Sequence, residues 1–327
     1  MSIQEIEISV QKWNEVDVHE LAQLAVEAWQ AKGSTLTVER FTNWLNRLEL
    51  RFPPVVVLAH SENNLIGWLL FHIQSPTETE INPWALNGHP IVSPDNKEEE
   101  IAAKLIEQAI NLAKREGVTR VEINYYAEER EQANQRYKAF YESLGMTLIE
   151  ENVHMRIELS KQELESVEVE FSSGGEIKPI ISIDEEEFFQ CFYQTFRDSK
   201  DRWFSDKSDN EIRDYFNDLI HESPFPLIEN ASIALLENNQ VIAFAVVRQS
   251  HGDDNGQLWV MGVHPEHRGK GFGRSLILFI KKELAKQGFR TMSLNVDLAN
   301  KPAFQLYQKQ GFKPEWCKIS HAWKAVD

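Results

Sequence analysis

One stretch of the chain constrains its fold more than any other, because a strand pattern, a glycine-rich loop and a helix pattern follow one another directly. The apolar strand pattern covers 258–263, the loop covers 268–274 and the amphipathic helix covers 275–287. A strand that leads through such a loop into a helix presents unpaired backbone N–H groups at the helix N-terminus. These donors and the positive end of the helix dipole favour a bound phosphate. The sequence therefore predicts an anion site at this position.

The composition of the loop supports an anion site. Basic residues alternate with glycines in the order Arg268, Gly269, Lys270, Gly271, Phe272, Gly273 and Arg274. Glycine permits positive φ and lets a ligand approach the backbone closely, while the basic side chains add positive charge. The spacing matches neither Gly-x-Gly-x-x-Gly nor a P-loop. The alternative to a ligand site is a tight turn.

The loop resembles the acyl-CoA signature of the GNAT acetyltransferase superfamily, Arg/Gln-x-x-Gly-x-Gly/Ala, which is met at Arg268, Gly271 and Gly273. A second segment, 300–312, resembles the Asn-x-x-Ala-x-x-x-Tyr-x-x-x-Gly-Phe element that closes the CoA site of that family. The resemblance covers 177–327 well. It implies an α/β fold of the α+β type, with a mixed, mostly antiparallel sheet flanked by helices. It also implies acetyl-CoA as co-substrate and no metal.

Hydrophobic periodicity predicts a similar order of elements in both halves. In the first half it predicts strands over 3–10, 55–59, 65–73, 84–91, 120–125 and 154–159, and helices over 17–31, 37–49, 98–116 and 132–143. In the second half it predicts a strand over 177–183, a hairpin over 233–247, strands over 258–263 and 292–296, and helices over 184–196, from Ser208 and over 275–287. Capping boxes are expected at Asp184 with Glu187 and at Ser208 with Glu211.

The two halves also share residue spacings. Three pairs of residues occupy equivalent positions: Asn134 and Asn300, Tyr141 and Tyr307, and Gly145 and Gly311. His89-Pro90 likewise corresponds to His264-Pro265. We therefore expect two tandem copies of one domain, at 1–160 and 177–327, joined by a linker at 161–176.

The first copy lacks the glycine-rich loop. In the shared register, residues 94–98 stand where the second copy has Gly269 through Gly273, and none of them is glycine. The helix that follows begins with Glu98, Glu99 and Glu100. Carboxylates at a helix N-terminus satisfy the dipole and repel a pyrophosphate. The first copy is therefore expected to be degenerate and not to bind CoA through its phosphates.

The resemblance assigns roles to further residues of the second copy. Backbone groups of Met261 and Val263 would line the pantetheine arm, and Gly262 between them suits a β-bulge. Ser275 would bind a phosphate oxygen, or it is a solvated serine of the first helical turn. Asn300 would contact the pantetheine arm, or it caps the helix that follows.

Tyr307 is the residue expected to act as general acid toward the CoA thiolate, because of its position in the second motif. The alternative is a packed aromatic side chain, which the presence of Tyr141 in the first copy also favours. The sequence does not identify a general base. The strand 258–263 carries no acid, and Glu229, His251 and Asp297 are candidates by location only. Deprotonation through water is equally consistent.

The acceptor would bind beside the first two helices of the second copy. These carry aromatic residues interleaved with acids, namely Phe192, Tyr193, Phe196, Trp203, Phe204, Tyr215 and Phe216 with Asp198, Asp201 and Asp206. Some of the aromatic side chains must form the apolar face that each helix needs. A pocket with aromatic walls and an acidic rim would suit an amine.

Charge and composition limit the class of protein. The net charge is −17, and it is uneven: residues 1–175 carry 29 acidic and 15 basic side chains, whereas residues 176–327 carry 22 and 19. Such an acidic surface makes nucleic acid an unsuitable partner. No apolar run is long enough to cross a bilayer, and the start of the chain does not resemble a signal peptide. With only Cys191 and Cys317, a disulfide framework or zinc site is not expected, and a cytoplasmic protein is.

These features together predict an acetyl-CoA-dependent N-acetyltransferase that transfers an acetyl group directly to a primary amine, preferably of a small molecule. The alternative is a non-catalytic CoA-binding or interaction protein on the same fold. The sequence leaves open whether the chain is a monomer or a homodimer.

Overall fold

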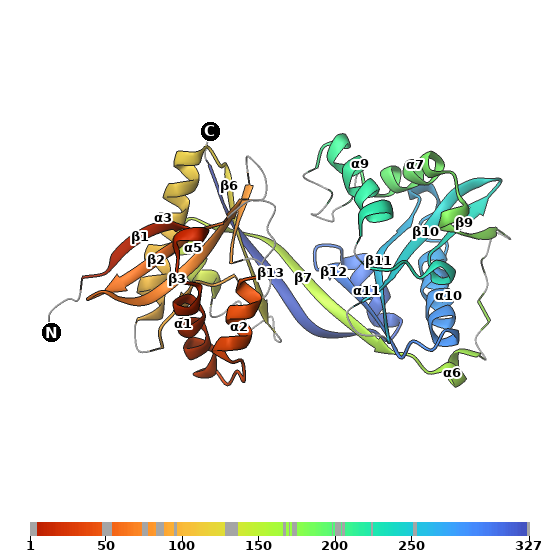
Figure 1. Cartoon of the computed structure of the whole chain (residues 1–327). Helices are drawn as coiled ribbons and strands as arrows, with labels where there is room; N and C mark the ends of the chain where they lie inside the picture. Colours follow the sequence, from red (N-terminus) through yellow and green to blue (C-terminus); the bar gives the residue numbers. More distant parts are fainter. Residues whose placement is uncertain are drawn as a thin grey trace. The chain divides into compact units, whose positions relative to one another are not determined.

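The computed structural model describes residues 5–325 except 48–53, 74–77, 83–87, 95–96, 128–136, 166–167, 170, 172–174, 198, 200–203, 205–206, 224 and 251–253. The chain forms two compact units (Figure 1). The first unit comprises Met1–Glu150 together with Lys318–Asp327, and the second comprises Glu151–Cys317. The domain boundaries expected from the sequence remain a prediction.

The first unit is built on a mostly antiparallel sheet with the strand order β1-β2-β3-β4-β6. These strands are β1 (Glu7–Lys12), β2 (Val55–Ser61), β3 (Asn64–Ile73), β4 (Glu78–Ile81) and β6 (Arg120–Ala127), and the short β5 (Ile91–Val92) pairs with β3. Only β4 and β6 run parallel among these described pairs. The β2–β3 turn is tight because Glu62 and Asn63 both adopt positive φ.

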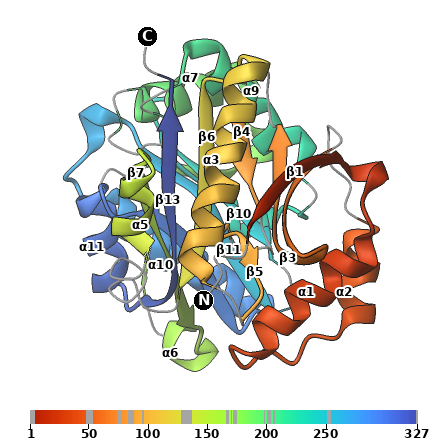
Figure 2. The ribbon, with the colours of Figure 1, turned by 90° about the vertical axis from the view of Figure 1, so that its left-hand side faces the viewer.

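Helices cover both faces of this sheet (Figure 2). They are α1 (Val18–Gln30), α2 (Val38–Leu45), α3 (Glu98–Glu116) and α5 (Ala139–Ser143). The helices α1 and α2 pack on the face that buries Trp68 and Leu70. The helix α3 packs on the opposite face, where Ile101 contacts the backbone of Gly67.

The second unit has the strand order β7-β12-β11-β10-β9-β8. These strands are β7 (Thr147–Glu158), β8 (Glu176–Pro179), β9 (Ile233–Glu237), β10 (Gln240–Gln249), β11 (Asn255–Val263) and β12 (Thr291–Asp297). The only parallel pair among them is β11 with β12. A last strand, β13 (Lys313–Lys324), begins in this unit, and its residues from Lys318 belong to the first unit.

Helices also cover both faces of the second sheet (Figure 1). On one face α7 (Glu185–Phe196) and α9 (Asp209–Asn217) bury an aromatic cluster that includes Phe188, Phe216 and Phe244. On the other face α10 (Phe272–Lys286) packs its apolar side on β9 and β10. The remaining elements are α6 (Lys161–Glu165), α11 (Lys301–Lys309) and the short turns Trp13–Glu15, Ile180–Ser182, Asp218–Glu222, Glu229–Ala231 and Pro265–His267.

The predicted α/β class with a mixed, mostly antiparallel sheet is confirmed, and several local expectations are wrong. The strand expected over 84–91 is absent at 88–90, and residues 83–87 of it lie outside the described part of the chain. The strand expected over 177–183 ends at Pro179, where a 3-10 turn begins. The helix expected from Ser275 already starts at Phe272. The strand β13 was not predicted.

A further error concerns the N-terminus of α7. The Asp184 side chain accepts a hydrogen bond from the Glu187 N–H at 3.0 Å, but the Glu187 carboxylate does not close a capping box. At Ser208 and Glu211 both halves of the box are present.

None of the described helices is long and apolar enough to span a bilayer. The described residues also contain no cluster of three His, Cys, Asp or Glu side chains arranged to hold a metal ion.

Candidate functional site

The glycine-rich loop forms a cradle at the N-terminus of α10. Gly271 is the N-cap residue with φ +89°, and Gly269 has φ +77°. A Cβ at either position would meet nothing within 4 Å, so backbone conformation and not crowding requires these glycines. The first turn of α10 contains no acidic residue. The cradle therefore keeps the positive end of the helix dipole uncompensated and suits an anion.

Arg268 fixes the position of this cradle. Its Nε donates to the Val263 carbonyl at 3.1 Å, and its Nη2 donates to the Thr195 carbonyl at 2.8 Å. These two bonds join the loop to the end of β11 and to α7. The guanidinium charge therefore lies beside the cradle, and its two hydrogen bonds hold the loop in place.

Gly273 brings the second motif against the first. A Cβ at Gly273 would lie 3.1 Å from Leu306 Cδ2, so the start of α10 and the helix α11 touch there. Farther along, Lys281 Nζ donates to the Gln310 carbonyl at 3.1 Å. Tyr307 follows Leu306 on α11, is 7% exposed and contacts Phe312 edge to face. The structure therefore brings the expected tyrosine onto the helix that borders the cradle.

The strands β11 and β12 diverge beside the cradle. They pair only from Asn255–Thr291 to Leu258–Leu294, although β12 continues to pair with β7 as far as Asp297. On its other side β11 pairs with β10, and this pairing contains a bulge. Val247 pairs with Leu258 and Val246 pairs with Val260, so Trp259 is an extra residue without a partner on β10. Bulges bend a strand and end regular pairing. The edge of β11 that carries Met261 and Val263 therefore faces an opening in the sheet.

The bulge expected at Gly262 thus lies at Trp259. Gly262 has a different role, because a Cβ there would lie 2.6 Å from Phe244 Cζ and 2.7 Å from Thr195 Cγ2. A side chain at this position would displace α7 from the sheet.

The other predicted site residues have local partners. Asn300 caps α11, since its Oδ1 accepts from the Ala303 N–H at 3.3 Å. Asp297 is 4% exposed and accepts from the Ala299 N–H at 2.8 Å, and Glu229 lies in a 3-10 turn. His251, Trp203, Asp198, Asp201 and Asp206 lie outside the described residues. Of the aromatic residues expected to wall the acceptor site, Phe192, Phe204 and Phe216 are buried in the core.

In the first unit, the equivalent position is filled by the chain itself. The parallel pairing of β4 with β6 ends at the pair Ile81–Ile123. Gly88 then packs against Asn124, the next residue of β6. A Cβ on Gly88 would lie 2.1 Å from the Asn124 carbonyl oxygen. The Asn82 side chain donates to the His89 carbonyl at 2.8 Å. A pantetheine arm would have to displace this backbone.

The tyrosine of the first unit is likewise engaged. Tyr141 is fully buried, its hydroxyl lies 2.9 Å from His89 Nδ1, and its ring stacks on Tyr125. At the start of α3, Glu98 pairs with Lys32 at 2.8 Å. Among the residues of the first unit that the structure describes, neither a glycine cradle nor an open strand edge is found.

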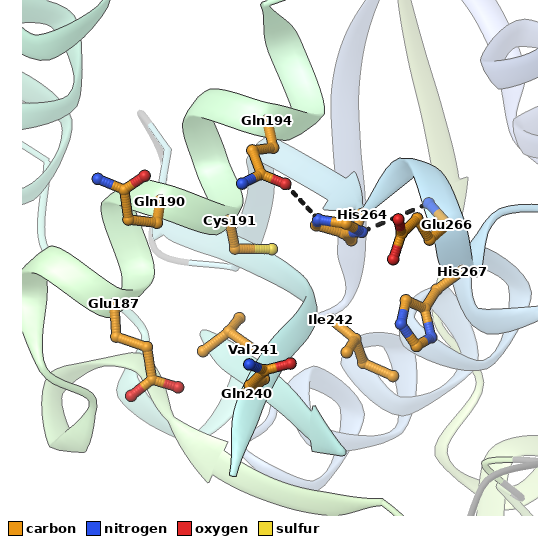
Figure 3. A pocket seen from close by; sticks show the side chains of 10 residues that line it. All are labelled: Glu187, Gln190, Cys191, Gln194, Gln240, Val241, Ile242, His264, Glu266 and His267. Carbon is orange, nitrogen blue, oxygen red and sulfur yellow. Dashed lines mark hydrogen bonds between the residues drawn. The ribbon is translucent and has the colours of Figure 1, made fainter. Parts of the chain in front are cut away.

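A separate pocket of about 260 Å³ lies beneath α7 (Figure 3). Sequence reasoning did not find it. It is lined from α7, from the start of β10 and from the turn that precedes the cradle, by Glu187, Gln190, Cys191, Gln194, Gln240, Val241, Ile242, His264, Glu266 and His267.

Comparison with known families matches this chain twice. The model described as the acetyltransferase (GNAT) family matches residues 18–146 and 185–312. Among curated proteins, the chain is similar to the mycothiol acetyltransferases of Streptomyces bingchenggensis (37% identity over 73 residues, 22% of this chain and 24% of that protein) and Thermomonospora curvata (34% over 96 residues, 29% and 32%). The matched segments thus span about a quarter to a third of these relatives.

Solved structures share the fold over nearly the whole chain. A GCN5-related N-acetyltransferase from Sphaerobacter thermophilus superposes with a TM-score of 0.62 at 15% identity, covering 98% of this chain and 97% of that chain. A tandem GNAT protein from the clavulanic acid biosynthesis pathway superposes with a TM-score of 0.59 at 14% identity, covering 98% and 99%.

Proposed function

The chain belongs to the acetyltransferase (GNAT) family, and we propose that its second half transfers the acetyl group of acetyl-CoA directly to the primary amine of a small molecule. The observation that carries this proposal is the position of the cradle beside the divergence of β11 and β12. A long, thin donor with a pyrophosphate can lie with its phosphates on Gly269, Lys270, Gly271 and Ser275. Its arm would then run along Met261 and Val263.

The two faces of the sheet suggest where each reactant lies. Met261 Cε lies 3.9 Å from the position of a Cβ on Gly273, so Met261 points to the face of α10. Val260 and Trp259 pack with the aromatic cluster of α7 and α9 on the opposite face. The donor would enter from the face of α10 and α11, and the amine would approach from the face of α7 and α9.

In this arrangement the amine nitrogen attacks the thioester carbonyl carbon, a backbone N–H of β11 stabilises the developing oxyanion, and the C–S bond breaks. Tyr307 on α11 lies on the donor's side and gives its proton to the departing sulfur. An ammonium substrate loses two protons in all. One restores the tyrosine and the other passes to solvent.

The names of the similar proteins support a small-molecule acceptor, since mycothiol acetyltransferases are named for a small molecule. We further propose that the first copy, at 1–160, supports the second without binding acetyl-CoA, and that 161–176 links the two. A cytoplasmic location fits a chain with only two cysteines, both of which are buried.

Replacing Tyr307 with phenylalanine tests the chemical step. We expect kcat with a small amine to fall about 100-fold, because the thiolate loses its proton donor while the apolar packing of the ring is kept. The KM for acetyl-CoA should stay within about twofold, because the cradle is untouched. Steady-state kinetics with a panel of primary amines provides the measurement.

The matched control is Tyr141→Phe, which removes the hydroxyl from the equivalent residue of the first copy. Its kcat should equal that of the wild type. Equal losses in the two variants, or none in Tyr307→Phe, would contradict the assignment of Tyr307. Absence of turnover in the wild type with every amine would contradict the proposed function.

A further inference from the structure

The pocket beneath α7 lies on the face from which we propose that the amine approaches, but its lining differs from that of the proposed donor site. None of the described residues that line it comes from β12 or α11, which border the opening. Its space of about 260 Å³ lies just below the roughly 300–1,000 Å³ of most small-molecule sites. It is therefore too small for a nucleotide and suits a compact polar molecule.

Glu187 provides the first sign of a ligand. A glutamate at the third helical position usually turns back to the N-cap backbone. Here the Glu187 carboxylate turns to the pocket wall instead, where its Oε1 is buried and has no hydrogen-bond partner (Figure 3). A buried carboxylate oxygen without a donor is costly, so a ligand whose donor draws this carboxylate into the pocket would stabilise it.

The charge of the lining defines which donor is suitable. The carboxylates of Glu187 and Glu266 face the pocket, and no lysine or arginine is found among its described lining residues. Both ring nitrogens of His264 are engaged by protein groups, because its Nδ1 accepts from the Glu266 N–H at 3.4 Å and its Nε2 lies 2.5 Å from Gln194 Oε1. The lining therefore carries an excess of negative charge.

Two other titratable side chains of the lining leave this excess unchanged. His267 lies 3.5 Å from Glu237, so a carboxylate outside the lining balances any charge on its imidazole. Burial raises the pKa of the Cys191 thiol to about 12, and the thiol therefore stays protonated and uncharged at neutral pH.

The remaining polar groups of the lining are the carboxamides of Gln190, Gln194 and Gln240. Gln190 Nε2 donates to Glu186 at 2.6 Å, and Gln194 Oε1 is bonded to His264. The amide oxygen of Gln190, the amide nitrogen of Gln194 and the carboxamide of Gln240 can still meet a ligand, and such a mixture of donors and acceptors suits hydroxyl groups. We propose that this pocket binds a small cationic polyol, with its ammonium on Glu187 and its hydroxyls on the carboxamides.

Calorimetric titration with two isosteric probes tests the proposal in the absence of acetyl-CoA. The probes are 1-amino-1-deoxyglucitol, which carries an ammonium, and glucitol, which has a hydroxyl in its place. We expect the amino compound to bind at least about tenfold more tightly, since a charge-assisted hydrogen bond to a carboxylate exceeds a neutral one. Equal affinity of the two probes, or no binding of either, would overturn the proposal.

Variants locate the site. Glu187→Gln should abolish the preference for the amino compound, and Gln190→Lys, at an exposed position one helical turn away, should do the same by placing an ammonium beside Glu187. Glu185→Gln removes an exposed carboxylate from the same turn of α7 outside the pocket and should change nothing. Retention of the preference in both pocket variants would overturn the proposal. Each variant is also titrated with acetyl-CoA. Unchanged acetyl-CoA binding shows that the variant is folded, and it tests the proposed function independently of the pocket.

Discussion

Replacing Gly271 with glutamate is expected to weaken acetyl-CoA binding at least about 100-fold, which corresponds to roughly 2.7 kcal/mol. Two effects add. A side chain at φ +89° costs about 1–2 kcal/mol and shifts the loop, and a carboxylate at the N-terminus of α10 opposes the pyrophosphate and occupies the helix dipole. Calorimetric titration of the variant with acetyl-CoA measures the loss.

Gly288→Glu is the matched control for this variant. Gly288 follows the C-terminal end of the same helix, has the same φ of +89° and would place its Cβ in open space, as Gly271 does. The control therefore adds the same strain and charge to the opposite end of α10. Its affinity for acetyl-CoA should stay within about twofold of the wild type. An equal loss in both variants would show that the cradle is not the binding site.

Replacing Gly88 with alanine is expected to destabilise the protein by roughly 3–5 kcal/mol, the largest effect on stability that we predict. The positive φ of +65° accounts for about 1–2 kcal/mol of this. The rest arises because the new Cβ would lie 2.1 Å from the backbone oxygen of Asn124 in β6, and a strand backbone cannot yield as a side-chain end does. Urea unfolding followed by circular dichroism measures the change.

Gly117→Ala separates strain from crowding. Gly117 ends α3 with φ +74°, and a Cβ there would meet nothing within 4 Å. It should cost only about 1–2 kcal/mol. Similar losses in the two variants would mean that Gly88 does not fill the gap beside β6, and the explanation for a degenerate first copy would then fail.

Local sequence signals predicted most elements of this fold. The hairpin predicted over 233–247 forms as β9 and β10, which turn at Asn238 and Asn239, both with positive φ. The helix α9 begins at the capping box of Ser208 and Glu211, as predicted. Turn and capping chemistry acts over a few residues, so a single sequence suffices to find it.

Features that depend on contacts distant in sequence were harder to predict. The bulge lies at Trp259 and not at Gly262. Residue 262 is a glycine for another reason, since it packs closely against Phe244 and α7. The strand β13 begins two residues after Gly311 and shows little alternation of apolar and polar residues at its start, so hydrophobic periodicity did not predict it. The pocket beneath α7 combines residues up to 80 positions apart, from Glu187 to His267, and no motif connects them.

In the candidate site, too, local motifs could be predicted from the sequence and contacts between distant residues could not. The cradle glycines were found from the sequence because a motif of seven residues contains them. The role of Arg268 as the link between β11 and α7 needed the structure, since its acceptor Thr195 lies in a different helix. A general base remains unassigned, because its position depends on the acceptor.

The central claim is that one half of this chain binds the acetyl donor and the other half does not. Calorimetric titration of the wild-type protein with acetyl-CoA tests it most directly. We expect one binding site per chain, since the second half has the cradle and the open strand edge while Gly88 and Glu98 occupy the equivalent places in the first. Two sites per chain, or no binding at millimolar acetyl-CoA, would contradict this account.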